Sequence, residues 1–144
     1  MSAQENKALF RRLLDELNRG NLEIVDQVVD PDAILISPHL PEPVRGRQAF
    51  KDAFGGAGIE ALGLQYTLEQ IIAEGDSVAA RFVGRGTHRG EFEGAPATGK
   101  SITMDVVAIY RVADGQIVEY RLSWDTLGFL QQVGAIPAAA GGTS

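Results

Sequence analysis

The sequence contains no cysteine, which excludes disulfide bonds, thiolate metal sites and cysteine nucleophiles. It also lacks any apolar run close to the roughly 20 residues that a membrane-spanning helix needs. An excess of basic charge is missing as well. The net charge is −6 with both signs interspersed, which disfavours a nucleic-acid partner. These absences leave a protein of the soluble class whose partners are neither nucleic acids nor membranes.

The N-terminal stretch MSAQENKALFRR is polar and has no apolar core of a signal peptide, so we expect a cytoplasmic protein. A chain of 144 residues with 44% apolar residues can build one hydrophobic core. We therefore expect a single domain over residues 1–136. The last stretch, residues 137–144, reads PAAAGGTS and has the composition of a flexible tail.

Helical periodicity dominates the first third of the chain. Phe10, Leu13, Leu14 and Leu17 have the spacing of one helix face, and the helix is expected to end at residues 18–20. Further elements are expected in this order: a short helix over 22–29, a strand over 32–37, and a helix over 47–54 that ends at Gly55 and Gly56.

The period then changes to two, which is typical of strands. Two predicted hairpins turn at Gly75-Asp76 and at Asp114-Gly115, and a closing helix over 126–133 ends at Gly134. This order predicts an α+β fold in which helices cover one face of a curved antiparallel sheet, and a cone-shaped sheet under a helix layer often leaves an apolar pocket.

The second hairpin can be joined by two loop residues or by three, with Gly115 as a left-handed bulge. We favour three because that loop gives one uniformly apolar face, on which Val118 also lies, with Ile117 on the opposite face. The earlier hairpin adds Leu68, Ile72 and Ala80 to the inner face. The residues predicted to line a pocket are Tyr66, Phe82, Met104, Val106, Ala108, Tyr110, Tyr120, Leu122 and Trp124. For most of them an ordinary core position is the competing interpretation.

The stretch GAPATGKS, residues 94–101, fits the pattern of a nucleotide-binding phosphate loop. Such a loop works only when a helix N-terminus follows it. Here Lys100 and Ser101 open onto ITMDVVAIYRV, which is rich in β-branched residues and predicts a strand. We therefore interpret the stretch as a loop between strands and expect no nucleotide partner.

Several stretches together resemble the SnoaL-like polyketide (ester) cyclase family: ENKALFRRLLDELNRGNLEIVDQVVDPDA, GRQAFKDAF, GTHRGEFEGAPATGKSI, IYRVADGQIVEYR and WDTLGFLQQVGAI. The resemblance runs from about Glu5 to Pro137. It implies the cone fold that is shared with ketosteroid isomerase and scytalone dehydratase, a deep apolar pocket, and a dimer or tetramer. It also implies aldol ring closure of a polyketide without a metal or other cofactor.

The resemblance further implies an acid/base aspartate on the last strand and a histidine on the neighbouring strand. With Asp114-Gly115 and residues 130–134 as landmarks, the aspartate position falls on Leu122 and the histidine position on Ala108. Both residues are apolar, so this pair is expected to be missing.

Three other residues are candidate acid/base groups. His39 lies in a loop that often reaches the pocket mouth in this fold, and His88 lies at a strand end, where a structural hydrogen bond is the competing interpretation. Asp125 is a candidate acid, although its position before a predicted helix favours an N-cap. Two histidines with no carboxylate motif beside them do not indicate a metal site.

Three functions stay open: a cofactor-free cyclase, isomerase or lyase acting on a hydrophobic small molecule, a non-catalytic module that binds such a molecule, and an epoxide hydrolase. The last chemistry needs an Asp-Arg-Asp set inside the pocket, and the predicted inward faces supply none. The opposite sheet face carries Val107, Ile109 and Ile117 among charges, which predicts a homodimer through that face.

Overall fold

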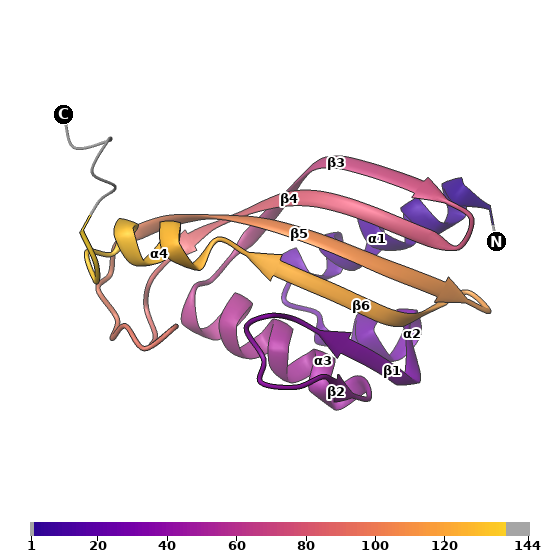
Figure 1. Ribbon diagram of the computed structural model, residues 1–144, viewed down its shortest axis with the longest axis horizontal. Coiled ribbons are helices and arrows are strands. Elements are labelled where there is room, and N and C mark those ends of the chain that lie inside the picture. Colours follow the sequence, from indigo (N-terminus) through magenta and orange to yellow (C-terminus); the bar gives the residue numbers. More distant parts are fainter. Residues whose placement is uncertain (1, 138–144) are drawn as a thin grey trace.

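The computed structural model describes residues 2–137 and has a six-stranded sheet as its main element (Figure 1). The strands lie in the order β2-β1-β6-β5-β4-β3. The two predicted hairpins form the antiparallel run from β3 to β6, and β1 extends the sheet by pairing in parallel with β6. The strands are β1 (Val29–Ile36), β2 (Val44–Arg45), β3 (Gln65–Glu74), β4 (Ser77–Thr87), β5 (Ser101–Ala113) and β6 (Gln116–Trp124).

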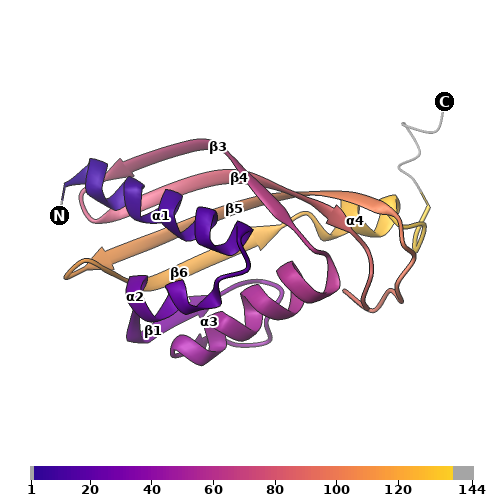
Figure 2. The same ribbon diagram turned by 180° about the vertical axis from the view of Figure 1, so that it is seen from behind.

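Helices cover one face of this sheet, as the view from behind shows (Figure 2). The helix α1 (Ala3–Asn18) packs on β3 and β4, and its buried residues include the four predicted from their spacing, Phe10, Leu13, Leu14 and Leu17. Ser2 and Glu5 form a capping box that fixes the start of α1. The other helical elements are η1 (Leu22–Ile24), α2 (Val25–Val28), α3 (Arg47–Ala53), the π-helix η2 (Phe54–Ala61) and α4 (Thr126–Gln132). None of the helices within residues 2–137 is long and apolar enough to cross a bilayer.

The helix that begins at Arg47 does not end at Gly55 and Gly56, which corrects the sequence expectation. Neither glycine has a positive φ, and the chain stays helical as η2 to Ala61. The left-handed conformation that ends a helix is reached only at Gly63, with φ 55°. Arg89 supports this end by donating hydrogen bonds to the carbonyls of Ile59 and Glu60, at 2.6 and 3.1 Å.

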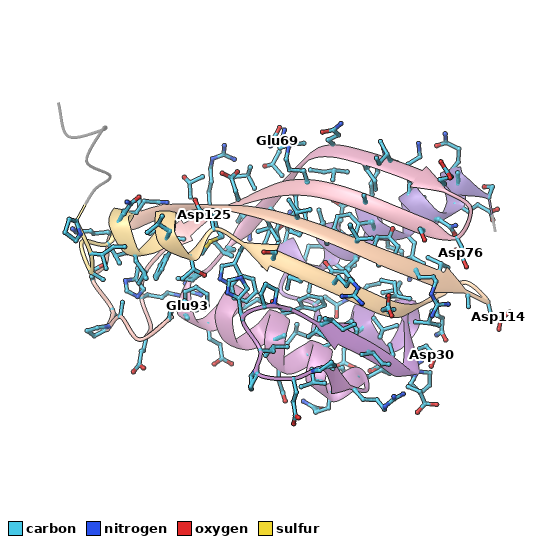
Figure 3. All side chains as sticks on the ribbon, viewed as in Figure 1. Asp30, Glu69, Asp76, Glu93, Asp114 and Asp125 are labelled. Carbon is cyan, nitrogen blue, oxygen red and sulfur yellow. The ribbon has the colours of Figure 1, made fainter. Side chains whose placement is uncertain are left out.

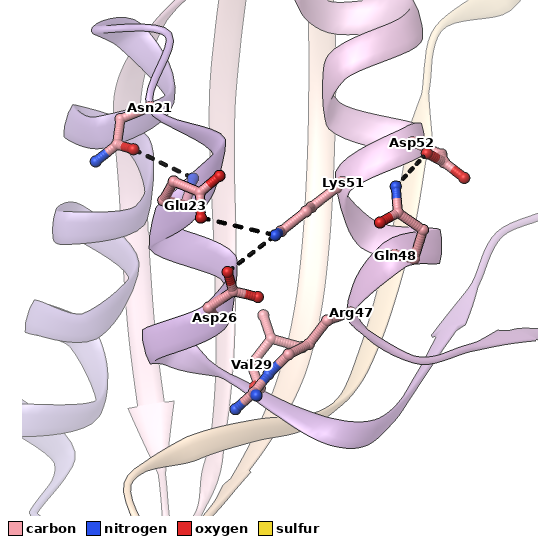
Figure 4. Close-up of polar contacts among 8 residues, drawn as sticks. All are labelled: Asn21, Glu23, Asp26, Val29, Arg47, Gln48, Lys51 and Asp52. Atoms are coloured by element: carbon pink, nitrogen blue, oxygen red, sulfur yellow. Dashed lines mark hydrogen bonds and ion pairs between the residues drawn. The ribbon is translucent and has the colours of Figure 1, made fainter.

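Charged contacts fasten α3 to the preceding helix (Figure 4). Lys51 Nζ lies 2.9 Å from a carboxylate oxygen of Asp26 and 3.9 Å from one of Glu23. The hydrogen bond from Lys51 lowers the pKa of Asp26 below its ordinary value. Arg47 also donates to the Val29 carbonyl at 2.7 Å, so α3 is held where β1 begins.

Two bulges change which side chains face the helices. In β3 the register shifts between Leu68 and Gln70, so Ile72 points outward and is 60% exposed, contrary to the expectation that it faces the helices. In the second hairpin the loop has two residues, because Asp114 and Gly115 both have positive φ and Ala113 pairs with Gln116.

The bulge of the second hairpin lies within β6 at Val118, opposite the step from Arg111 to Val112 in β5, and not at Gly115. As a result Ile117 is fully buried in the core, which corrects the prediction that it lies on the outer face. Beyond the bulge the side chains lie on the predicted faces of the sheet, since Tyr110 pairs with Tyr120 and Val106 with Trp124. The residues 138–144 of the expected tail lie outside the described part of the chain.

Candidate functional site

A cavity of about 280 Å³ lies between the sheet and the helices. The structure places seven of the nine predicted pocket residues on its wall: Tyr66, Phe82, Met104, Val106, Tyr120, Leu122 and Trp124. Strand alternation brings these side chains to one face, where the antiparallel pairing sets them side by side. The wall is therefore largely apolar, with two phenol hydroxyls and one indole as its polar groups from the sheet.

The other two predicted pocket residues, Ala108 and Tyr110, do not line the cavity. Each is only 1% exposed, because α1 closes this part of the sheet. The Tyr110 ring stacks on Phe10 of α1, with centroids 5.5 Å apart, and its hydroxyl donates to the Asn6 carbonyl at 2.6 Å. Tyr110 is a core residue whose polar end is satisfied by the protein itself.

His39 reaches the cavity from the loop between β1 and β2. Its ring lies flat on Trp124, with centroids 3.7 Å apart and planes 6° apart. Nε2 accepts the backbone N–H of Trp124 at 3.3 Å, and Nδ1 lies 3.1 Å from Thr126 Oγ1. Because Nε2 is an acceptor, the proton of the neutral ring lies on Nδ1 and is donated to Thr126. Taking up a second proton at Nε2 would break the bond to Trp124.

His88 and Asp125 lie away from the cavity wall. His88 is fully buried, with Nδ1 3.0 Å from Thr98 Oγ1 and Nε2 3.2 Å from the Ala95 carbonyl. Asp125 is exposed at the junction of β6 and α4 (Figure 3), where its side chain accepts the Gly128 N–H at 2.8 Å. The N-cap interpretation of Asp125 is confirmed.

The helices and three connecting segments contribute wall residues that the sequence analysis missed. They are Leu14, Leu17, Leu40, Asp52, Ala53, Phe54, Gly58, Leu62, Leu64, Phe92 and Glu93. The carboxylates of Asp52 and Glu93 belong to exposed residues, and Asp52 accepts a hydrogen bond from Gln48 at 2.8 Å (Figures 3 and 4). The helical spacing of Phe50 and Phe54 could have indicated that a helix contributes to the cavity wall. The sequence analysis ended that helix at Gly55 and Gly56, so the later wall residues of η2 were not predicted.

Glycine at position 58 sets the width of the cavity at one point. A Cβ atom there would lie 2.6 Å from the Tyr66 hydroxyl oxygen, which is closer than such atoms come in real proteins. The bare backbone of η2 and the Tyr66 side chain therefore approach each other directly.

The two positions at which the family resemblance places an acid/base pair are direct neighbours. Ala108 and Leu122 pair across β5 and β6 on the face that is turned to the helices. Leu122 lies on the cavity wall, and Ala108 beside it is buried. Neither side chain can donate or accept a proton.

The loop that fits the phosphate-loop pattern leads into a strand, as expected. Gly94 and Gly99 have φ values of 79° and 74°, and Lys100 is exposed immediately before β5. No group of three or more metal-ligating side chains is gathered in the part of the chain that the structure describes.

Comparison with known proteins agrees with this geometry. A family model described as SnoaL-like polyketide cyclase matches residues 8–133. Two aklanonic acid methyl ester cyclases, DauD of Streptomyces sp. strain C5 and DnrD of Streptomyces peucetius, are each 31% identical over 133 residues. These alignments cover 88% of this chain, and 80% of DauD and 88% of DnrD. The crystal structure of AclR from Streptomyces galilaeus superposes with a TM-score of 0.83 at 30% identity, covering 96% of this chain and 86% of AclR. The predicted α+β cone fold is confirmed.

Proposed function

The chain belongs to the SnoaL-like polyketide cyclase family, and on that premise we propose that it acts on a hydrophobic, polyketide-type molecule held in its cavity. The proposed chemistry is ring closure or isomerisation by proton transfer without a cofactor. The observation that carries the proposal is the cavity, which lies between helices and sheet and is lined mainly by apolar and aromatic side chains. A flat hydrophobic ligand would bury its surface against this wall.

His39 is the proposed acid/base group, because it alone of the three candidates lies on the cavity wall. Histidine is the side chain that most often transfers protons in enzymes. Proton transfer through Nε2 requires that the hydrogen bond from the Trp124 backbone N–H be broken first.

A second candidate function is binding without catalysis. It is favoured by Leu122 and Ala108, which put methyl groups where the resemblance implies an aspartate and a histidine. It is also favoured by the hydrogen bonds that already occupy both nitrogens of His39. An epoxide hydrolase lacks such support, since no arginine lines the cavity within residues 2–137.

Turnover of aklanonic acid methyl ester, the substrate in the names of the two cyclase relatives, tests the proposal when it is followed by chromatography with wild-type protein and with His39→Phe. Phenylalanine keeps a flat ring against Trp124 but has no nitrogen, so binding should persist while turnover falls by about 10²-fold or more. Turnover that is unchanged in His39→Phe would show that another group transfers the proton. Binding by the wild type with no turnover would establish the non-catalytic module.

The aspartate and histidine that the family resemblance implies can also be introduced by substitution. Leu122→Asp with Ala108→His places a carboxylate at the cavity wall, where burial raises its pKa and a protonated histidine lowers it. We expect a loss of stability of about 1–3 kcal/mol, together with a gain in cyclisation. A stable double variant with wild-type turnover would show that this site is not where ring closure occurs.

A further inference from the structure

The chain has three tyrosines, and their hydroxyl groups differ in what they meet. The Tyr110 hydroxyl is bonded to the Asn6 carbonyl at 2.6 Å and lies away from the cavity. Tyr66 and Tyr120 both line the cavity, and within residues 2–137 neither of their hydroxyls has a hydrogen-bond partner. Neither hydroxyl oxygen is among the fully buried polar atoms that lack a partner, so both are open to the cavity, where a ligand can meet them.

Their surroundings keep both phenols protonated. Burial raises the pKa of Tyr66 to about 12 and raises that of Tyr120 further. The Tyr120 ring is held edge-on by Phe50 and Phe54, at centroid distances of 6.0 and 5.9 Å, and is 1% exposed. Phe54, which packs on Tyr120, and Gly58, which the Tyr66 hydroxyl approaches, lie four residues apart on η2, so both phenols face the same stretch of that helix.

We propose that the hydroxyls of Tyr66 and Tyr120 are a pair of hydrogen-bond donors for a carbonyl oxygen of the ligand. This inference rests on the proposed function, because it requires that the cavity binds a ligand at all. It goes further by giving that ligand a ketone or quinone oxygen and by assigning the two residues that position it.

The charges around the cavity favour a neutral carbonyl over a carboxylate. No lysine or arginine lines the wall in the described part of the chain, whereas Asp52 and Glu93 do. An anionic ligand would meet these two carboxylates without a compensating cation. A neutral carbonyl needs only hydrogen-bond donors, and a protonated phenol is one.

Two planar tricyclic probes that differ in one oxygen test the proposal. 9-Fluorenone carries a ketone, and fluorene has the same ring system without it. Equilibrium dialysis would give the dissociation constants of both for the wild type, Tyr66→Phe, Tyr120→Phe and the double variant. The ratio of the two constants removes the hydrophobic contribution that both probes share.

We expect the preference for fluorenone to fall by about tenfold from the wild type to the double variant, and by about three- to fivefold in each single variant. Tyr110→Phe is the matched control, since its hydroxyl bonds to Asn6 outside the cavity. It should lower stability and leave the preference unchanged. The infrared carbonyl band of fluorenone bound to wild-type protein should also shift to lower frequency, a measurement that does not depend on any variant folding.

The outcomes separate this proposal from the one before it. Binding of both probes with a ratio that the double variant leaves unchanged, or an unshifted carbonyl band, would overturn the donor pair and leave the cavity as a binding site. Failure of wild-type protein to bind either probe would overturn both proposals.

Discussion

The imidazole of His88 bridges two points of the loop that follows it, Thr98 Oγ1 at 3.0 Å and the Ala95 carbonyl at 3.2 Å. The same loop is closed at its base by backbone hydrogen bonds between His88 and residues 99 and 100. Phe92 and Glu93 of this loop lie on the cavity wall. His88 thus shapes the cavity through the loop, without lying on the cavity wall.

Replacement of His88 by alanine should therefore destabilise the fold. The change removes two hydrogen bonds, one of them buried, and leaves the Ala95 carbonyl with the Phe92 N–H as its remaining donor, which we expect to cost about 1–3 kcal/mol. Urea denaturation measures this loss. Thr98→Val, which removes only one of the two bonds, should cost less. A His88→Ala protein with full stability but no turnover would instead reveal a direct catalytic role.

Asp125 should contribute to stability through the first turn of α4. Asp125→Ala removes the acceptor for the Gly128 N–H, and the free energy of unfolding should fall by about 1 kcal/mol. Asp125→Asn keeps an oxygen at the cap and should be close to wild type. The same two variants test catalysis, because a turnover lost in Asp125→Asn despite native stability would contradict a purely structural role.

The outer sheet face should join two copies of the chain. Ile72, Val107 and Ile109 are 60%, 47% and 49% exposed on this face, and a dimer would cover them. Ile109→Lys is expected to shift the mass measured by light scattering from dimer to monomer. The control is Leu127→Lys, since Leu127 is 60% exposed but lies on α4. A wild-type monomer at high micromolar concentration would refute the dimer.

Alkaline pH should unfold the protein through its tyrosines. Burial raises the pKa of all three phenols above the unfolded value of 10, and that of Tyr66 to about 12. The protonated forms therefore stabilise the fold fully below pH 10, and this stability is lost as the pH rises from 10 towards 12 and beyond. Phenolate absorbance should rise together with the loss of circular dichroism. Phenolate formation near pH 10 in a folded protein would show that the phenols are accessible.

The sequence was sufficient for the order of the helices and hairpins and for most of the sheet side of the cavity. Alternation from Met104 to Tyr110 and from Tyr120 to Trp124 survives in the structure, because no bulge interrupts those runs. Alternation failed at Ile72 and Ile117, where one extra residue in a strand reverses the faces. Such a bulge leaves no clear mark on the pattern of apolar residues.

The helical wall was harder to predict for a different reason. Gly55 and Gly56 have the composition of a helix end, but a glycine ends a helix only when it adopts the left-handed conformation, and here Gly63 does so. The position of His39 against Trp124 depends on contacts between residues that are 85 positions apart, which local spacing cannot reveal.

Gly58 lies so close to Tyr66 that the lack of a side chain at position 58 affects how much space a ligand has. Because a methyl group at position 58 would meet the Tyr66 oxygen at 2.6 Å, any larger residue there must push the phenol aside or narrow the space in front of it. Chains with the same fold could therefore accept smaller molecules through one codon change, with the sheet, its register and the aromatic wall left as they are. In this protein we expect the absence of a side chain at Gly58 to set an upper limit on the size of the ligand.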